Sequence, residues 1–175
     1  MKTIILFSIL ITTPLFSQNK EIPTIQYDNQ GFSPVVFDVG ELSEEKIYDN
    51  IYVWISKYYK NPDFVIKSNI PNKLIKINGY KENSHGYNQM GFRVYNNMRY
   101  YITFDIKKGK YRFSFEIDKI TNENNGEGYY PEDLFKRGQI RKNKIYRQMY
   151  SELLLSINDI SNSLYNSFEN KNDDW

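Results

Sequence analysis

The feature that most constrains the fold is a long stretch of alternating apolar and polar residues at positions 92–107. A period of two places successive side chains on opposite faces of a β-strand. Residues 110–120 alternate in the same way, and Lys108-Gly109 between the two stretches is a turn signal. A long β-hairpin with one apolar and one polar face is therefore predicted. Its first strand places on the apolar face Phe92, Val94, Met98, Tyr100, Ile102, Phe104 and Ile106, with Asn96 as the polar exception.

The register of this hairpin follows from the position of its turn, because partners lie symmetrically about Lys108-Gly109. A slip of one residue would turn the whole apolar face into water, so the register is strongly specified. The predicted pairs are Phe104–Phe113, Ile102–Phe115 and Tyr100–Ile117 on the apolar face, and Asp105–Arg112, Thr103–Ser114 and Arg99–Asp118 on the polar face.

Shorter elements are predicted before the hairpin. Residues 32–39 are rich in β-forming side chains, and Ser43 is a good N-cap for a helix whose apolar face runs from Ile47 to Tyr58. Residues 64–70 and 74–81 indicate two strands, followed by a polar loop at 82–90. The turn between these strands places Lys67 beside Lys76, a destabilising pair of like charges unless the side chains splay apart or bind something.

After the hairpin, residues 121–138 are rich in Asn, Gly and Glu and indicate a long loop, with one turn of helix near 131–135. Loops of this length are often functional. Residues 142–168 carry apolar side chains every three or four positions, which predicts a long amphipathic helix.

The N-terminus indicates export. Residues 1–17 combine Lys2, an apolar run and a small residue at Ser17, the pattern of a signal peptide, and the run is too short for a stable membrane anchor. The chain has no Cys, so it has no disulfides, thiolate metal sites or cysteine-linked lipid. We expect an extension at 18–30, one domain at 31–168 and a polar tail at 169–175, in the periplasm or outside the cell.

The order strand, helix, four strands, helix after a signal peptide resembles a family of secreted bacterial domains of unknown function with a TATA-binding-protein-like (TBP-like) fold. The resemblance depends on the helix block from Ser43 to Trp54, on Gly79-Tyr80, and on the hairpin from Phe104 to Phe115. It implies an α+β fold from a Gram-negative bacterium, with a curved antiparallel β-sheet of about five strands and two helices packed on one face. It implies no activity.

The open face of such a sheet is the predicted binding surface, since exposed Tyr and Arg are good anchors. The alternation places there Arg93, Tyr95, Arg99, Tyr101 and Arg112. Nucleic acid is not expected as a partner, because the predicted register neutralises Arg99 and Arg112 with acids and the N-terminal pattern indicates export. With 17 Lys and no Ala, the pattern of an AT-rich genome, a Lys-rich surface is not in itself evidence of an anionic partner. An ordinary solvated sheet face is the alternative.

We therefore expect a non-catalytic exported domain that binds a protein or an envelope component through the open face or the 121–138 loop. One alternative is a hydrolase that uses His85, placed in a flexible loop, or the loop acids Glu127, Glu132 and Asp133. Another alternative is a subunit that self-associates through the sheet. A lone His makes no metal site, and no phosphate or dinucleotide fingerprint occurs, so neither metal nor cofactor is expected.

Overall fold

A computed structural model describes residues 22–28 and 31–169. The predicted signal peptide, residues 18–21 of the extension and the tail beyond Glu169 lie outside the described residues. The main element is an antiparallel six-stranded sheet in the order β3-β7-β6-β5-β4, with β8 paired to β7. Its strands are β3 (Val35–Asp38), β4 (Ile66–Ile70), β5 (Leu74–Gln89), β6 (Phe92–Lys107), β7 (Lys110–Asn122) and β8 (Gly128–Tyr129).

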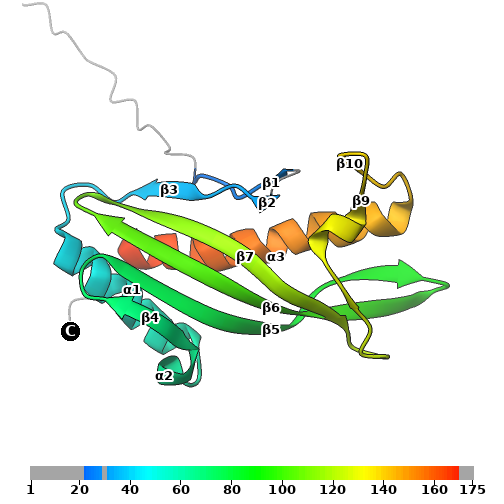
Figure 1. Cartoon of the computed structure of the whole chain (residues 1–175), viewed down its shortest axis with the longest axis horizontal. Coiled ribbons are helices and arrows are strands. Elements are labelled where there is room, and N and C mark those ends of the chain that lie inside the picture. Colours follow the sequence, from blue (N-terminus) through cyan, green and yellow to red (C-terminus); the bar gives the residue numbers. More distant parts are fainter. Residues whose placement is uncertain (1–21, 29–30, 170–175) are drawn as a thin grey trace, which may run out of the picture.

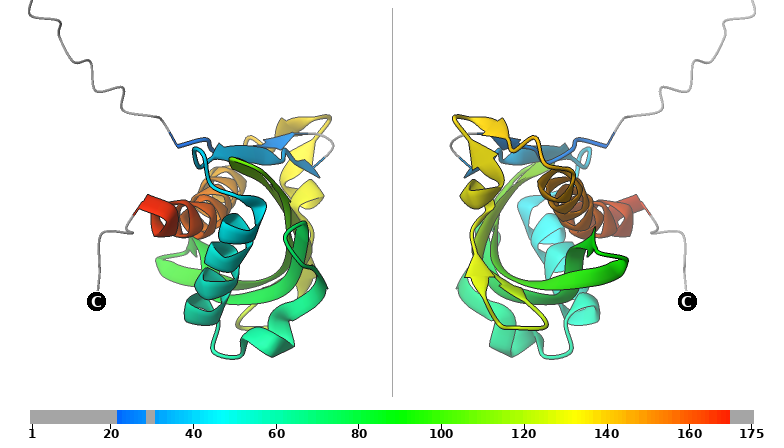
Figure 2. Two further views of the ribbon diagram at one scale, coloured as in Figure 1. Left: turned by 90° about the vertical axis from the view of Figure 1, so that its left-hand side faces the viewer. Right: turned by 90° about the vertical axis from the view of Figure 1, so that its right-hand side faces the viewer.

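Two long helices, α1 (Glu44–Tyr58) and α3 (Lys144–Glu169), lie on the concave face of this sheet (Figure 2). Helix α3 runs along the length of the molecule (Figure 1). The predicted α+β class and the curved antiparallel sheet with two helices on one face are therefore confirmed, with one more sheet strand than expected.

The turn of helix predicted near 131–135 is the 3-10 helix η1 (Pro131–Leu134). The other small elements were not predicted individually, because such short segments carry no clear period. They are the hairpins β1 (Tyr27–Asp28) with β2 (Gly31–Phe32) and β9 (Phe135–Lys136) with β10 (Gln139–Ile140), and the short helix α2 (Pro62–Val65). Elements β8, η1 and β9 give regular structure to residues 128–129 and 131–136 of the predicted 121–138 loop.

The predicted helix start at Ser43 is confirmed, since its side chain accepts a hydrogen bond from the Lys46 amide at 3.2 Å. The buried face of α1 consists of Ile47, Ile51, Trp54 and Ile55, which the 3.6-residue period had indicated.

The register of the β6–β7 hairpin is confirmed from its turn as far as Tyr100–Ile117. A bulge then inserts Asp118 into β7, so Arg99 lies opposite Lys119 and the predicted pairing of Arg99 with Asp118 is wrong by one residue. The extra residue changes which positions of β7 face the helices, and it brings Ile120 into the core beside Ile117.

The predicted loop at 82–90 is wrong, because β5 continues to Gln89. A register shift between Lys81 and His85 lets β5 follow β6 to its end, where Met90-Gly91 forms the turn. The physical reason is backbone pairing. Residues 92–96 of β6 present backbone groups on their β5 side, and residues 85–89 pair with them there, so the polar segment continues as a strand.

The predicted contact between Lys67 and Lys76 is also wrong. A register shift between Ile66 and Ser68 places Ser68, not Lys67, opposite Lys76. Each ammonium group lies over an aromatic ring instead, that of Lys67 over Phe64 at 4.7 Å and that of Lys76 over Tyr101 at 4.9 Å. The bulge therefore removes the like-charge repulsion.

Aromatic rings fill much of the space between sheet and helices. The buried Tyr100 ring stacks on Phe115 with 5.0 Å between centroids, and its hydroxyl hydrogen-bonds the Tyr59 hydroxyl at 3.0 Å. Gly79 pairs with Tyr100 on the neighbouring strand, and a Cβ at Gly79 would lie 2.4 Å from the Tyr100 ring. A glycine is therefore required by packing at this position.

We predict that Gly79→Ala lowers the free energy of unfolding by about 2–3 kcal/mol, because Tyr100 must move from its stacked position. Urea denaturation measures the change. Gly128→Ala is the matched control, since the nearest atom to its new Cβ belongs to the flexible end of Lys119. An equal loss in both variants would show that the Tyr100 contact is not the cause.

Candidate functional site

The predicted open-face residues all stand at outward positions of β6 and β7, where they alternate with side chains turned to the helices. They form two groups. Arg99 ion-pairs with Asp118, and Arg112 donates two hydrogen bonds to Asp105 at 2.9 and 3.1 Å. Tyr101 lies under the Lys76 ammonium. The predicted neutralisation of both arginines is therefore confirmed, and their role in binding stays a prediction.

Arg93 and Tyr95 form the second group, near the start of β6. The guanidinium of Arg93 lies 5.4 Å from the Tyr95 ring centroid and ion-pairs with Glu152 of α3. It passes Gly86, where a Cβ would lie 3.0 Å from Arg93 Nε. Because Gly86 has no side chain, Arg93 can cross β5 to reach the helix.

Glu152 and its neighbour Gln148 cover an open edge of the sheet. The backbone amides of Gly86 and Asn88 donate to the side chains of Glu152 at 2.9 Å and Gln148 at 3.1 Å. Burial raises the pKa of Glu152, but hydrogen bonds from Arg93, Gln148 and Gly86 outweigh burial and hold it below its ordinary value. Helix α3 is thereby fixed against the second half of β5, and the first turn of the helix lies beside the end of that strand.

His85 is a buried strand residue, so the prediction of a flexible loop around it is wrong. It is 2% exposed, and burial lowers its pKa to about 4. Ser84 Oγ donates to the Asn96 carbonyl oxygen at 3.0 Å and thus accepts from His85 Nδ1 at 2.9 Å. His85 Nε2 is then free to accept the hydrogen bond from the Tyr129 hydroxyl. The side chain of His85 ties β5 to β8 across the sheet.

This hydrogen-bond pattern does not suit the hydrolase alternative based on His85. A nucleophilic serine needs an unprotonated nitrogen of the base to accept its hydroxyl proton. Here Nδ1 carries the proton toward Ser84, and Tyr129 occupies Nε2. The pair is arranged as a buried structural link.

The loop acids are also dispersed. Asp133 lines a cavity beside α3, Glu132 lines a different one and accepts a hydrogen bond from the Tyr27 hydroxyl, and Glu127 is bonded to Asn125. The structure therefore does not bring the three carboxylates into one cavity.

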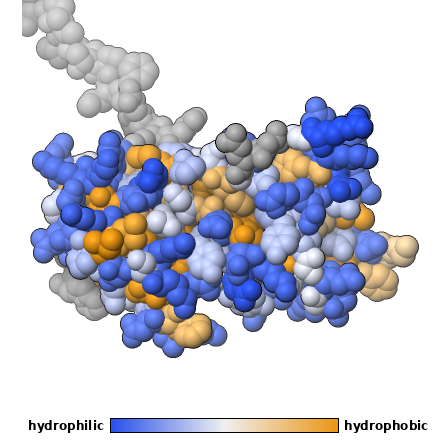
Figure 3. Space-filling model, viewed as in Figure 1, coloured by the Kyte–Doolittle hydropathy of each residue, from blue (hydrophilic) through white to orange (hydrophobic). Residues whose placement is uncertain are grey.

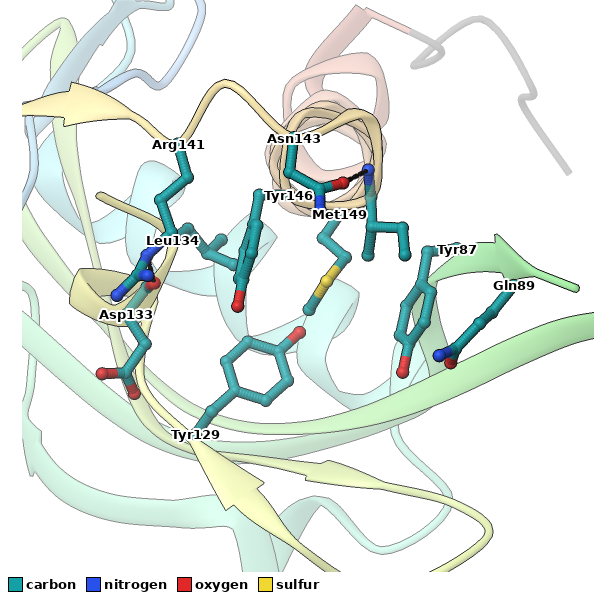
Figure 4. Close-up of a pocket in the computed structure, with 10 residues that line it drawn as sticks. Tyr87, Gln89, Tyr129, Asp133, Leu134, Arg141, Asn143, Tyr146 and Met149 are labelled. Atoms are coloured by element: carbon teal, nitrogen blue, oxygen red, sulfur yellow. Dashed lines mark hydrogen bonds between the residues drawn. The ribbon is translucent and has the colours of Figure 1, made fainter. Parts of the chain in front are cut away.

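A cavity of about 520 Å³ opens where the end of β5, the segment from Tyr129 to Arg141 and the start of α3 meet (Figure 4). Three tyrosines form much of its wall, and Tyr129 projects into it from β8. The lining residues are Tyr87, Gln89, Tyr129, Asp133, Leu134, Arg141, Asn143, Ile145, Tyr146 and Met149. Its volume lies in the range of small-molecule sites, and its lining joins an apolar floor to several polar groups.

Arg141 is held in position in the wall of this cavity. Its Nε donates to the Asp133 carbonyl oxygen at 2.9 Å, and its guanidinium lies 5.2 Å from the Tyr146 ring centroid. Arg141, Asn143 and Tyr146 also line an adjoining cavity of about 630 Å³, together with Lys136, Arg137 and Lys142. The two cavities therefore share one wall and one fixed guanidinium.

Positive charge is concentrated around these cavities. Residues 132–147 hold six Lys or Arg and two acids, a net charge of +4, whereas the whole chain has +2. Among the described residues, no carboxylate pairs with Arg137, Arg141 or Arg147, and Arg147 donates to the Lys142 carbonyl oxygen at 2.7 Å. We call this set the basic end: Lys136, Arg137, Arg141, Lys142, Lys144 and Arg147. In the view of Figure 3, the most hydrophilic patch of the surface lies over β9 and β10.

Sequence reasoning located only part of this site. It singled out the 121–138 loop, but it treated Lys as a genomic bias and did not separate the arginines of the sheet from those at 137–147. The available signal was the distribution of Arg, since three of the chain's six arginines fall within eleven residues.

Within residues 22–28 and 31–169, no three His, Cys, Asp or Glu side chains gather closely enough to hold a metal ion. No helix in the same part of the chain is long and apolar enough to cross a membrane.

We predict that the free energy of unfolding falls by about 2 kcal/mol between pH 7 and pH 5 through His85 alone. His85 binds a proton near pH 6.5 in the unfolded chain and only near pH 4 in the folded chain. As the pH falls, the unfolded state therefore takes up this proton first and is stabilised relative to the folded state. Urea denaturation at the two pH values measures the loss. His85 is the only histidine, so a His85→Gln variant should show almost no loss above pH 5. An unchanged slope in that variant would contradict the assignment.

Comparison with known proteins supports the fold. No protein-family model matches the chain, and no curated protein matches it in sequence. Two solved structures are similar to it, both with a TM-score of 0.61. One is a DUF4468 family protein from Bacteroides ovatus, at 19% identity over 82% of this chain and 88% of that protein. The other is a TBP-like protein from Parabacteroides distasonis, at 16% identity over 79% of this chain and 92% of that one. The chain thus has the fold of the TBP-like proteins of unknown function that its sequence resembles.

Proposed function

We propose that this chain is an exported, non-catalytic binding domain that takes an acidic saccharide of the cell envelope at the cavities beside the start of α3. The observation that carries the proposal is the contrast between two sets of arginines. Arg93, Arg99 and Arg112 on the sheet each have a carboxylate partner. Those of the basic end have none among the described residues, so their charge is available to a ligand.

The chemistry of the walls supports the ligand class. A guanidinium presents a planar fork that matches a carboxylate. Arg141 is already fixed by Asp133 and Tyr146, so binding costs little side-chain entropy. The aromatic faces of Tyr87, Tyr129 and Tyr146 offer flat apolar surfaces for the ring of a sugar.

Export is supported by the N-terminal pattern of a positive residue, an apolar run and a small residue at Ser17. The mature protein then meets its ligand in the periplasm or outside the cell, where acidic glycans are accessible. The open sheet face has the weaker claim, because each of its guanidinium groups is already neutralised.

We predict that Arg141→Gln weakens binding of oligogalacturonate, an acidic oligosaccharide, about 10- to 100-fold, because a charge-assisted hydrogen bond to the ligand is lost. Isothermal titration calorimetry measures the affinity, and a neutral galactose oligomer should not bind.

Arg99→Gln is the matched control, since Arg99 is an ion-paired guanidinium on the open face and its loss should leave the affinity unchanged. Absence of binding by the wild-type chain would refute the acidic-saccharide class. Loss of binding in the Arg99 variant alone would show that the saccharide binds at the open face of the sheet and not at the cavities.

A further inference from the structure

Two hairpin turns near the cavity have an unusual composition. Strands β5 and β6 are joined by Met90-Gly91, and β9 and β10 by Arg137-Gly138. All four residues have positive φ, as a two-residue turn of this kind requires. The first position normally carries Asn, Asp or Gly, and a long side chain there is strained.

Among the described residues, four that are not glycine have positive φ: Asn72, Asn83, Met90 and Arg137. The two asparagines are of the type that tolerates this conformation. The other two, Met90 and Arg137, lie at the turns described above. The backbone is therefore strained at the two positions that carry one apolar and one cationic side chain. A strained conformation of this kind points to function.

The β5–β6 turn exposes large apolar groups. Met90 is 91% exposed and Phe92 is 76% exposed, so together they form an apolar tip at the end of the paired strands. The tip adjoins the basic end, because Gln89, one residue before Met90, lines the cavity with Arg141 and Asn143. Figures 1 and 3 show both regions at the same end of the molecule.

We infer that this end of the protein docks on an anionic lipid bilayer, with Met90 and Phe92 entering the interfacial layer and the basic end lying against the headgroups. Apolar groups that enter the interface and cations attracted to anionic lipid are the two signals that reversible membrane binding combines.

A bilayer fits these residues better than a protein does. A stable protein interface buries about 800 Å² on each partner around a well-packed apolar centre. Two side chains at the end of a narrow hairpin do not supply that centre, whereas a fluid interface needs only that they enter it. The β5–β6 hairpin is paired up to Gln89 and Phe92, so the tip is presented on a rigid support.

The inference is independent of a saccharide in the cavity, since neither Met90 nor Phe92 lines it. Bilayer docking and saccharide binding can therefore fail separately.

The test is co-sedimentation of the mature chain, purified after export, with vesicles of 30% phosphatidylglycerol and 70% phosphatidylcholine. We expect binding to these vesicles, little binding to pure phosphatidylcholine, and release at high salt as the charges are screened. Millimolar glycerol phosphate should not release the protein if a bilayer, and not a free phosphate group, is recognised. Equal binding to both vesicle types, release by glycerol phosphate, or no binding at all would overturn the proposal.

The tip is tested with Met90→Asn/Phe92→Thr. Asn suits the positive φ of the turn and Thr suits a strand, so this variant should remain folded. We expect its partition into the anionic vesicles to fall at least about tenfold, while its affinity for oligogalacturonate stays that of the wild type. Phe64→Thr is the matched control, because Phe64 is 72% exposed in α2, far from the tip in Figure 1, and its loss should not alter vesicle binding.

A Phe92→Trp variant gives a direct readout. Its added fluorescence should shift to shorter wavelength with anionic vesicles and be quenched by brominated lipid, since tryptophan prefers the membrane interface. An unshifted spectrum in a bound protein, or equal vesicle binding by the tip variant and the wild type, would show that the tip does not enter the bilayer.

Discussion

The arrangement of the end of the molecule that holds the cavity depends on one edge of the sheet. Strand β4 covers β5 only up to Ile77, so the rest of β5 has a free backbone edge. Unpaired strand edges promote aggregation and are usually covered. Here Gln148 and Glu152, four residues apart on α3, accept hydrogen bonds from the amides of Asn88 and Gly86. The helix replaces a strand along this edge, and its position there brings the start of α3 to the end of β5 and so forms the cavity.

The sequence predicted those parts of the fold that repeat regularly. The alternation in β6 and the first part of β7 specified a register in which Phe104 meets Phe113, and the structure has it. The predictions were wrong at irregular points, because a bulge changes pairing without changing composition. Asp118 and Lys67 both stand at such points. The apparent loop around His85 is a strand for a related reason, since its polar residues hide the period that its partner β6 imposes.

The candidate site was predictable only in part, and the reason is again physical. An arginine in a strand and an arginine in a turn look alike in a sequence, although the first meets a carboxylate across the ladder and the second does not. The pairing of Arg112 with Asp105 followed from register, whereas the freedom of Arg137 depends on a two-residue hairpin with no alternation to reveal it. The cavity itself joins segments more than fifty residues apart, Tyr87 and Tyr146 among them, and no local pattern relates them.

The buried polar groups near the cavity indicate why this end keeps its shape. His85 links β5 to β8 through Tyr129, and Asn96 stands on the intervening strand β6 with no hydrogen-bond partner for its side chain among the described residues. The hydrogen-bonded pair of His85 and Tyr129 fixes a specific arrangement that apolar contacts alone do not enforce, whereas the unpartnered side chain of Asn96 costs stability. Tyr129 is the shared element, because its hydroxyl is fixed by His85 while its ring forms a cavity wall. A substitution that loosens His85 would therefore reach the ligand through Tyr129, although His85 does not line the main cavity, and the core under α1 would be left intact.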